Sequence, residues 1–196
     1  PLSPFHPLSP PSPRFSNSWG PLPADLLRNG ARVFYATPQS AASVADCAAA
    51  LKERVEAVVR ETGCEKVNLI AHSKGGLDCR YAISRLGLAP MVATLTTINT
   101  PHRGCAFVDW LLKKCPSSVC SHIAKTYNAA LRRFGDKNPD FLAAVRDLTS
   151  ERCKLFNEEV RNAPGAVYPS CGSMMLSPRP APMPLSPDYR FVRHVP

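Results

Sequence analysis

Residues 71–75, Ala-His-Ser-Lys-Gly, place a serine where its hydroxyl could attack an electrophilic carbonyl. The segment follows a run of apolar residues and precedes a helical pattern that begins at Gly75. A sharp strand-to-helix turn lifts a serine side chain above a sheet, and it favours small residues such as Ala71 and Gly75. The backbone N–H of Lys74, at the helix N-terminus, would point toward negative charge developing on the carbonyl oxygen. We therefore predict Ser73 as a nucleophile; the alternative is a serine that only caps the helix.

The residues around this turn predict alternating strands and helices. Strands are expected at 31–36, 66–71 and 91–98. Helices are expected at about 40–62 and at 75–87. The longer one is indicated by apolar residues at spacings of three and four: Val44, Cys47, Leu51, Val55 and Val58. This alternation favours an α/β fold, a parallel sheet covered by helices on both faces, with ligand sites beyond the carboxyl ends of the strands.

Residues 105–161 have a different character and read as wholly helical, in about three pieces. We expect breaks near Pro116 and near 135–139, with Asn138 or Asp140 as the cap of the last piece. Such a block is either an ordinary packing layer or a lid over the site. A short helix at 24–29, ended by Gly30, and a further strand at 166–174 complete the expected elements.

Proline marks the two ends of the chain. Of 21 prolines, 8 lie in residues 1–23 and 8 in residues 164–196. Proline lacks a backbone N–H and fixes φ, so it disfavours helix interiors and central strands. We expect an irregular segment at 1–23, a folded domain at 24–175 and a proline-rich tail at 176–196.

Composition and charge limit the binding partners and the cellular location that we expect. The 196 residues suit one domain, and 44% hydrophobic residues with a net charge of +9 fit a globular protein with a solvated basic surface or an attraction to anionic lipid. No nucleic-acid motif accompanies the charge, so we expect no nucleic acid partner and a monomer. No run of about 18 apolar residues predicts a membrane span. The start lacks the pattern of a secretory signal, which indicates a cytoplasmic protein, or a secreted one if the N-terminus is incomplete.

Cysteine usage predicts neither a disulfide framework nor a metal. The chain has 8 cysteines, which in a domain of this size are expected as reduced thiols. Cys115, Cys120 and His122 lie close in sequence but lack the paired short spacings of zinc sites. We expect no cofactor.

Two motifs in order resemble the bacterial triacylglycerol lipase family of α/β-hydrolases. The first is KVNLIAHSKGGLDCRYAISRLG with its Ala-x-Ser-x-Gly turn, and the second is TLTTINTPHRGCAFVDWLL, where residues 99–104 are similar to the family's Pro-His-x-Gly turn. The resemblance is strongest over 63–110 and extends loosely to 174, with the helical block in the place of the lid. It implies an α/β-hydrolase fold and hydrolysis of a lipid or other small-molecule ester through an acyl-enzyme on Ser73, with contact to a lipid surface.

A serine nucleophile needs a histidine base and an orienting carboxylate, which in this fold follow the serine in the order acid, then base. His194 is the only histidine after the helical block, and Asp188 is the only carboxylate in the tail before it. They make the candidate pair. The fold supplies its acid and base from two successive strands, however, so a chain that stops before the true pair is favoured over these two.

The remaining histidines are assigned to the surroundings of the site or to the surface. His72 and His102 are expected as pocket or supporting residues, and His122 as a surface residue. The resemblance places His6 beside a second oxyanion donor, but Pro7, which has no N–H, replaces the family's glycine. The altered N-terminal pattern and the uncertain pair leave a second hypothesis, a catalytically incomplete module that binds a lipid or a partner. A thioesterase or an acyltransferase would share the same serine turn.

Overall fold

The computed structural model describes residues 19–36, 41–133, 139–175 and 189–194; for 174–175 and 189–194 it describes the backbone alone. The chain divides into two compact units, residues 1–38 and 39–196. The described part of the first unit holds α1 (Leu22–Arg28), which ends at Asn29. Gly30 follows with a φ of 83°, so the predicted helix and its glycine stop are confirmed.

The predicted strand at 31–36 is wrong. These residues form neither helix nor strand and join no sheet within the described ranges. β-branched and aromatic residues favour a strand only where a neighbouring strand accepts and donates the backbone hydrogen bonds. Composition alone carries no information about that partner.

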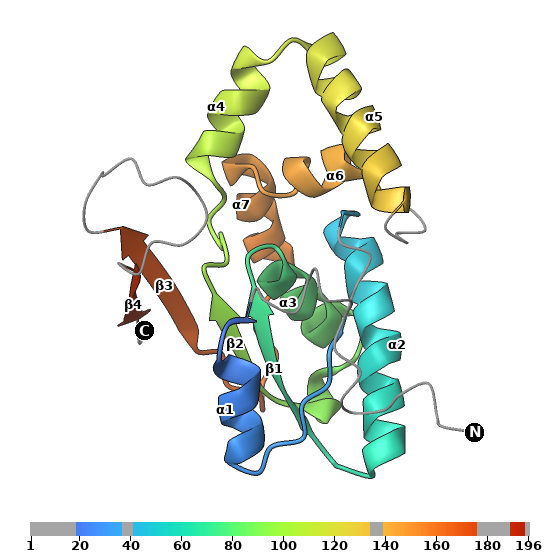
Figure 1. Ribbon diagram of the computed structural model, residues 1–196, viewed down its shortest axis with the longest axis vertical. Helices are drawn as coiled ribbons and strands as arrows, with labels where there is room; N and C mark the ends of the chain where they lie inside the picture. The colour runs from blue at the N-terminus through green and yellow to red at the C-terminus, as the bar shows by residue number, and fades with distance from the viewer. Residues whose placement is uncertain (1–18, 37–40, 134–138, 176–188, 195–196) are drawn as a thin grey trace. The chain divides into compact units, whose positions relative to one another are not determined.

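The sheet of the second unit has four strands in the order β1 (Val67–His72), β2 (Val92–Ile98), β3 (Ser170–Met175) and β4 (Tyr189–His194). β1, β2 and β3 run parallel, and β4 runs antiparallel to β3 (Figure 1). The parallel α/β class is confirmed, and so are the strands expected at 66–71, 91–98 and 166–174. β4 was not predicted and lies within the segment expected to be an irregular tail.

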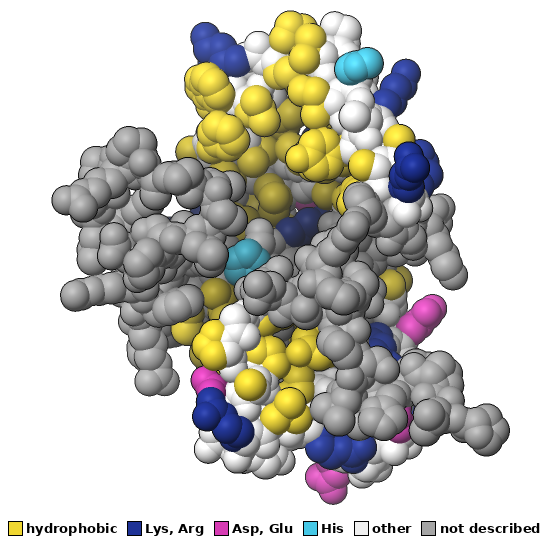
Figure 2. Space-filling view, viewed as in Figure 1, with side chains coloured by type: hydrophobic (Ala, Val, Ile, Leu, Met, Phe, Trp, Pro, Cys, Tyr) yellow, Lys and Arg dark blue, Asp and Glu magenta, His cyan; other side chains and the backbone are white. Residues whose placement is uncertain are grey.

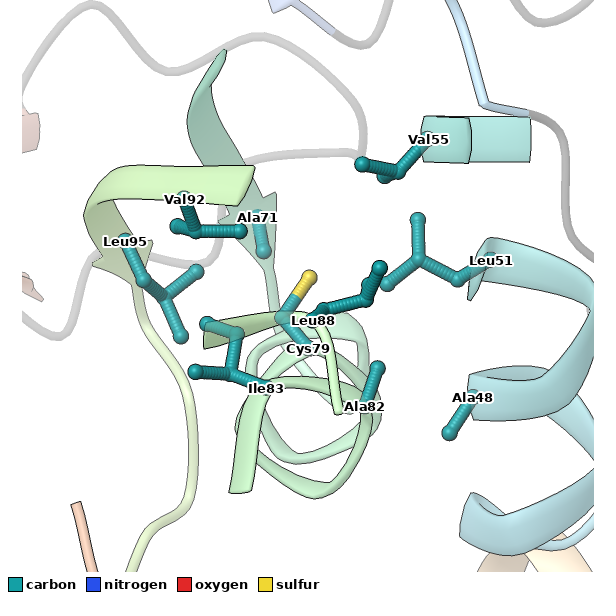
Figure 3. Close-up of a cluster of buried hydrophobic side chains, with 10 residues drawn as sticks. All are labelled: Ala48, Leu51, Val55, Ala71, Cys79, Ala82, Ile83, Leu88, Val92 and Leu95. Carbon is teal, nitrogen blue, oxygen red and sulfur yellow. The ribbon is translucent and has the colours of Figure 1, made fainter. Parts of the chain in front are cut away.

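Helices α2 (Val44–Thr62) and α3 (Gly75–Arg85) pack against each other, and α3 packs against β1 and β2. Ser43 begins α2 by accepting a hydrogen bond from the Asp46 N–H, and Gly63 ends it with a φ of 68°. Side chains from both helices and both strands converge in one buried cluster (Figure 3): Ala48, Leu51, Val55, Ala71, Cys79, Ala82, Ile83, Leu88, Val92 and Leu95. This cluster fixes β1 relative to α3, and therefore the turn between them.

The helical block between β2 and β3 consists of α4 (Ala106–Lys114), α5 (Ser117–Arg133), α6 (Phe141–Arg146) and α7 (Ser150–Glu159). The expectation of about three pieces is wrong because Thr149 caps a further helix, its side chain accepting from the Arg152 N–H. Asp140 caps α6 as predicted, with 3.0 Å from its Oδ1 to the Ala143 nitrogen. The alternative cap, Asn138, lies outside the described residues.

Within this block, the two ends of the segment that carries α4, α5 and α6 meet. The Cys105 N–H donates to the Leu148 carbonyl oxygen over 2.9 Å. Asp109 in α4 accepts from the Ser150 N–H at the start of α7 over 3.1 Å. Gly104 has a φ of 86°, and a Cβ there would lie 2.6 Å from the Ser150 nitrogen. This junction therefore requires glycine for both its conformation and its space.

The helices α4 and α5 expose a band of large apolar side chains: Phe107, Trp110, Leu111, Val119, Ile123 and Tyr127. Figure 2 shows hydrophobic side chains gathered over these two helices. The Phe107 and Trp110 rings stack with centroids 5.9 Å apart. None of the helices described has both the length and the apolar character needed to cross a membrane.

Candidate functional site

Ser73 lies between the last residue of β1 and the first residue of α3, with a φ of 53°. Positive φ is uncommon for a residue with a Cβ and costs of order 1–3 kcal/mol. The turn is held in place because the Ser73 N–H donates to the Ile98 carbonyl oxygen at the end of β2 over 2.9 Å. Ser73 is half-buried, so its side chain retains access to solvent.

The backbone after Ser73 turns directly into a helix. The Gly76 N–H donates to the Ser73 carbonyl oxygen over 3.1 Å, and the Leu77 N–H donates to the Lys74 carbonyl oxygen over 2.8 Å. The N–H groups of Lys74 and Gly75 precede these bonds, at the positive end of α3. Such N–H groups can donate to an anionic oxygen.

Gly76, the second residue of α3, is closely packed against the turn that follows β2. A Cβ on Gly76 would overlap the Thr100 side chain, lying 2.7 Å from its Cγ2 atom. A Cβ on Gly75 would lie 3.9 Å from the Ala71 Cβ, which is an ordinary contact. The absence of a side chain at Gly76 therefore lets the turn after β2 pack closely against the start of α3.

That turn is fixed at its first residue by Asn99, which has a φ of 52°. The Asn99 side chain donates to the Ser173 hydroxyl over 2.8 Å and accepts from the Ser173 N–H over 2.7 Å. β3 therefore holds residues 98–100 in place, and these residues contact both Ser73 and Gly76. This role of Asn99 was not predicted, although the residue belongs to the second motif.

Lys74 and Asp78 form a buried ion pair in the first turn of α3, with 2.7 Å between Nζ and Oδ1. Their side chains are 12% and 7% exposed. Burial raises the pKa of Asp78 to about 6, Lys74 opposes that shift, and Asp147 adds to it. Burial, with Asp78 nearby, also raises the pKa of the Cys47 thiol, and the Lys74 ammonium group opposes that shift. Asp78 was not predicted as a site residue, although its spacing of four from Lys74 is the spacing of helical ion pairs.

His102 is half-buried, with both ring nitrogens engaged. Nδ1 lies 3.3 Å from the Arg80 guanidinium, and Nε2 lies 3.1 Å from the Thr97 hydroxyl. Because a guanidinium only donates, Nδ1 accepts and Nε2 carries the proton. Burial, with Arg80 nearby, lowers the pKa of His102 to about 4. His102 is therefore a neutral residue that ties β2 to α3.

Arg80 extends this network to α7. Its guanidinium donates to Asn157 Oδ1 over 2.8 Å and to the Val160 carbonyl oxygen over 3.1 Å. The Asn157 amide donates in turn to the His102 carbonyl oxygen over 2.7 Å. Neither Arg80 nor Asn157 was predicted, since nothing in the spacing of a surface-like arginine and asparagine indicates that they share a partner.

Among the described residues, no hydrogen bond or ion pair joins the other predicted residues to Ser73. His72 is exposed, and His122 is exposed on α5. His6 and Asp188 lie outside the described residues. Over the described ranges, no three His, Cys, Asp or Glu side chains cluster as metal ligands would.

His194 is described by its backbone, in β4. It pairs with Ser170 of β3, Ser170 pairs with Thr97 of β2, and Thr97 pairs with Ala71 of β1. Three strand spacings of about 4.8 Å each separate β4 from β1, roughly 14 Å in all. In this register the His194 backbone lies three strands away from Ala71, which precedes Ser73 by two residues.

Comparison with known proteins agrees with this architecture. A family model described as palmitoyl protein thioesterase matches residues 30–143. Triacylglycerol lipases of Pseudarthrobacter phenanthrenivorans and Burkholderia plantarii are each 36% identical over 166 residues, 79% of this chain and 50% and 45% of theirs. The chain thus spans about half the length of these curated relatives.

Solved structures show the same fold. The mature form of Bacillus licheniformis lipase BlEst2 matches with a TM-score of 0.57 and 20% identity, over 78% of this chain and 58% of that one. Phospholipase PlaB from Legionella pneumophila matches with a TM-score of 0.53 and 17% identity, over 79% of this chain and 35% of that one. The parallel sheet, the helical block and these matches together place the chain in the α/β-hydrolase family of lipases and palmitoyl protein thioesterases.

Proposed function

We propose that this chain hydrolyses carboxylic esters of lipids and that Ser73 is the nucleophile. The observation that carries the proposal is the φ of 53° at Ser73, between a parallel strand and a helix N-terminus. Strain of this kind persists where the surrounding structure imposes it, and it is concentrated at active sites. The relatives named as triacylglycerol lipases support an ester substrate.

In the proposed reaction the Ser73 Oγ attacks the ester carbonyl carbon and a base takes the hydroxyl proton. The carbonyl oxygen becomes an anion, and the Lys74 N–H donates to it at the positive end of α3. The C–O bond to the alcohol then breaks and the alcohol leaves with the proton. Water attacks the acyl-serine, releases the fatty acid and restores Ser73.

The direct test compares turnover of p-nitrophenyl esters by the wild type and by Ser73→Ala. We expect the substitution to abolish turnover and to abolish labelling by a fluorophosphonate, which should map to Ser73 by mass spectrometry. Ser84→Ala is the matched control, because Ser84 also lies in α3 and its buried hydroxyl has no hydrogen-bond partner among the described residues. Labelling of another residue, or turnover by Ser73→Ala, would remove Ser73 from the reaction.

The base needs a separate test. Asp188 and His194 remain the predicted pair, and His194→Ala should abolish turnover if His194 acts on Ser73. The register of β4 supports the opposite expectation, unchanged turnover in His194→Ala. The two outcomes decide between the predicted pair and a base elsewhere.

The acyl substrate can be an oxygen ester or a thioester. The family model that matches residues 30–143 is described by a thioesterase activity, whereas the curated relatives are named as lipases. Turnover of p-nitrophenyl palmitate and of a palmitoyl thioester, measured on one preparation, ranks the two classes. We expect the oxygen ester to be turned over faster.

We also propose contact with a lipid surface through α4 and α5. The apolar band on these helices includes Phe107 and Trp110, which are 64% and 55% exposed. The same helices carry the exposed basic residues Lys113, Lys114, Lys125, Arg132 and Arg133, and one acidic residue, Asp109. An apolar face flanked by cations suits the surface of an anionic bilayer.

Co-sedimentation with phosphatidylserine-containing vesicles tests this contact. The double variant Phe107→Ser/Trp110→Ser should lose most of the binding, whereas Leu155→Ser, at an exposed leucine of α7, should keep it. Binding that survives in the double variant would place the lipid contact elsewhere. If vesicle binding persists in Ser73→Ala while neither form turns over esters, the alternative of a catalytically incomplete lipid-binding module is favoured.

A further inference from the structure

The lysine that follows the candidate nucleophile is turned inward. Lysine is rarely buried in proteins, because its ammonium group is strongly hydrated. Lys74 is nevertheless 12% exposed, and its Nζ lies 2.7 Å from the Oδ1 of Asp78, which is 7% exposed. An exposed lysine at this position would satisfy its charge in water, so the inward arrangement needs another reason.

Stability is not that reason. Attraction to Lys74 lowers the pKa of Asp78, yet burial outweighs it and the pKa is raised to about 6. At neutral pH, ionised Asp78 therefore costs folding free energy instead of contributing it. Buried ion pairs commonly fail to recover their desolvation cost, and one attested use is to fix a conformation.

The ion pair lies among side chains from three helical segments. Lys74 and Asp78 belong to the start of α3, and the Cys47 thiol of α2 is near enough for Lys74 to oppose the rise in its pKa. Asp147, between α6 and α7, faces Asp78 and accepts from the Val44 N–H at the start of α2 over 2.8 Å. Arg152 lies 3.7 Å from Asp147 and balances its charge. The Lys74 side chain is thus held inside the protein by Asp78, close to α2 and to the residue between α6 and α7.

We propose that the Lys74 side chain and Asp78 are positioning residues that hold the Lys74 backbone so that its N–H is aimed at the oxyanion. The inference rests on the proposed role of Ser73. Lys74 directly follows Ser73, so a side chain anchored in the interior restrains the rotation of the same residue whose N–H donates. An oxyanion donor acts only within a narrow range of geometry, so a small displacement lowers the rate.

The test uses two variants and a matched control on the full chain. Asp78→Asn removes the anion, and Lys74→Met/Asp78→Asn removes both charges and leaves no ion buried alone. Lys52→Met/Glu56→Gln is the control, because Lys52 and Glu56 form a pair with the same spacing on α2 that is 39% and 30% exposed.

The first readout is the set of backbone amide signals of residues 73–76 in a 1H–15N spectrum, which does not depend on turnover. We expect these signals to be displaced in both variants and to stay at their wild-type positions in the control. The second readout is ester hydrolysis, with kcat reduced about tenfold or more, KM within about twofold, and the control unchanged.

Folded variants whose amide signals of residues 73–76 match those of the wild type would overturn the proposal. So would a kcat within twofold of the wild type. If the wild type neither turns over esters nor labels at Ser73, the proposed function has failed, and the amide signals alone decide whether the pair positions the turn.

Discussion

Two regions of the molecule differ from the usual pattern of charged side chains outside and apolar side chains inside. The first turn of α3 buries charge, and the surface of α4 and α5 exposes apolar side chains. In α3 two charged side chains, Lys74 and Asp78, are 12% and 7% exposed. In α4 two large aromatic side chains, Phe107 and Trp110, are 64% and 55% exposed. Burial of charge and exposure of apolar surface both cost folding free energy. The two regions are therefore where a function, rather than stability, accounts for the sequence.

The largest effect on stability is expected inside the first region. Leu77 is 1% exposed, beside Asp78 on α3, and it packs with Val44 and Cys153. Leu77→Ala should lower the free energy of unfolding by about 2–5 kcal/mol, since it removes buried apolar surface and leaves a cavity. Urea unfolding followed by circular dichroism measures it. A loss below about 1 kcal/mol would mean that the packing around α3 is looser than the structure shows.

The next effect is expected at the junction between the two regions. Gly104→Ala places a Cβ against the Ser150 backbone at a φ of 86°, and should cost about 3 kcal/mol or more. Gly87→Ala is the control, because its φ of 81° is similar but nothing lies within 4 Å of the added Cβ. We expect the control to cost about 1–2 kcal/mol. Equal losses in the two variants would show that the close approach at residue 104 has little weight.

Two buried or half-buried groups, Asp78 and His102, should make the free energy of unfolding depend on pH. The pKa of Asp78 is raised from 3.8 to about 6, so its contribution to stability is present below 3.8 and is lost as pH rises to 6. The pKa of His102 is lowered from 6.5 to about 4, so its contribution is present above 6.5 and is lost as pH falls to 4. The two contributions oppose each other and leave a nearly flat wild-type profile.

Asp78→Asn should uncover the contribution of His102, with stability rising by about 1–2 kcal/mol between pH 4 and 6.5, since solvent screens the partly exposed ring. Urea unfolding at three pH values in this range measures the slope. Glu56→Gln, at the partly exposed carboxyl on α2, should keep the wild-type profile. A profile of Asp78→Asn that runs parallel to that of the wild type would show that Asp78 titrates as an ordinary surface carboxyl does.

The smallest effect on stability is expected in the second region. Trp110→Ala removes a large side chain that is 55% exposed and should change the free energy of unfolding by no more than about 0.5–1 kcal/mol, including its stacking on Phe107. The same thermal or urea unfolding assay applies. A loss comparable to that of Leu77→Ala would mean that the aromatic pair is covered in solution, and the comparison between the regions would fail.

Sequence patterns predicted the elements whose signals are local. The apolar spacing of α2 and the caps at Gly30 and Asp140 follow from neighbouring residues, and the order of strands and helices around Ser73 follows from them too. The strand at 31–36 was wrong, and β4 was missed, because a strand depends on partners distant in sequence.

Local sequence patterns did not predict the polar contacts between residues that are distant in sequence. Arg80, His102 and Asn157 meet from three elements, and Asn99 meets Ser173 across the sheet. Each residue has a type that is usually solvated, so its pattern in the sequence is that of a surface residue. The second motif indicated that residues 99–104 are important, but not that they support the start of α3.

The hydrogen bond between Cys105 and Leu148 joins the two ends of the segment that carries α4, α5 and α6. A segment whose two ends meet can change its length or composition while the strands on either side keep their register. Exchange of α4 and α5 for helices of another sequence is thus a route to new surface preferences that leaves the serine turn intact. Such an exchange would have to keep Gly104, because a side chain at that position would overlap the Ser150 backbone.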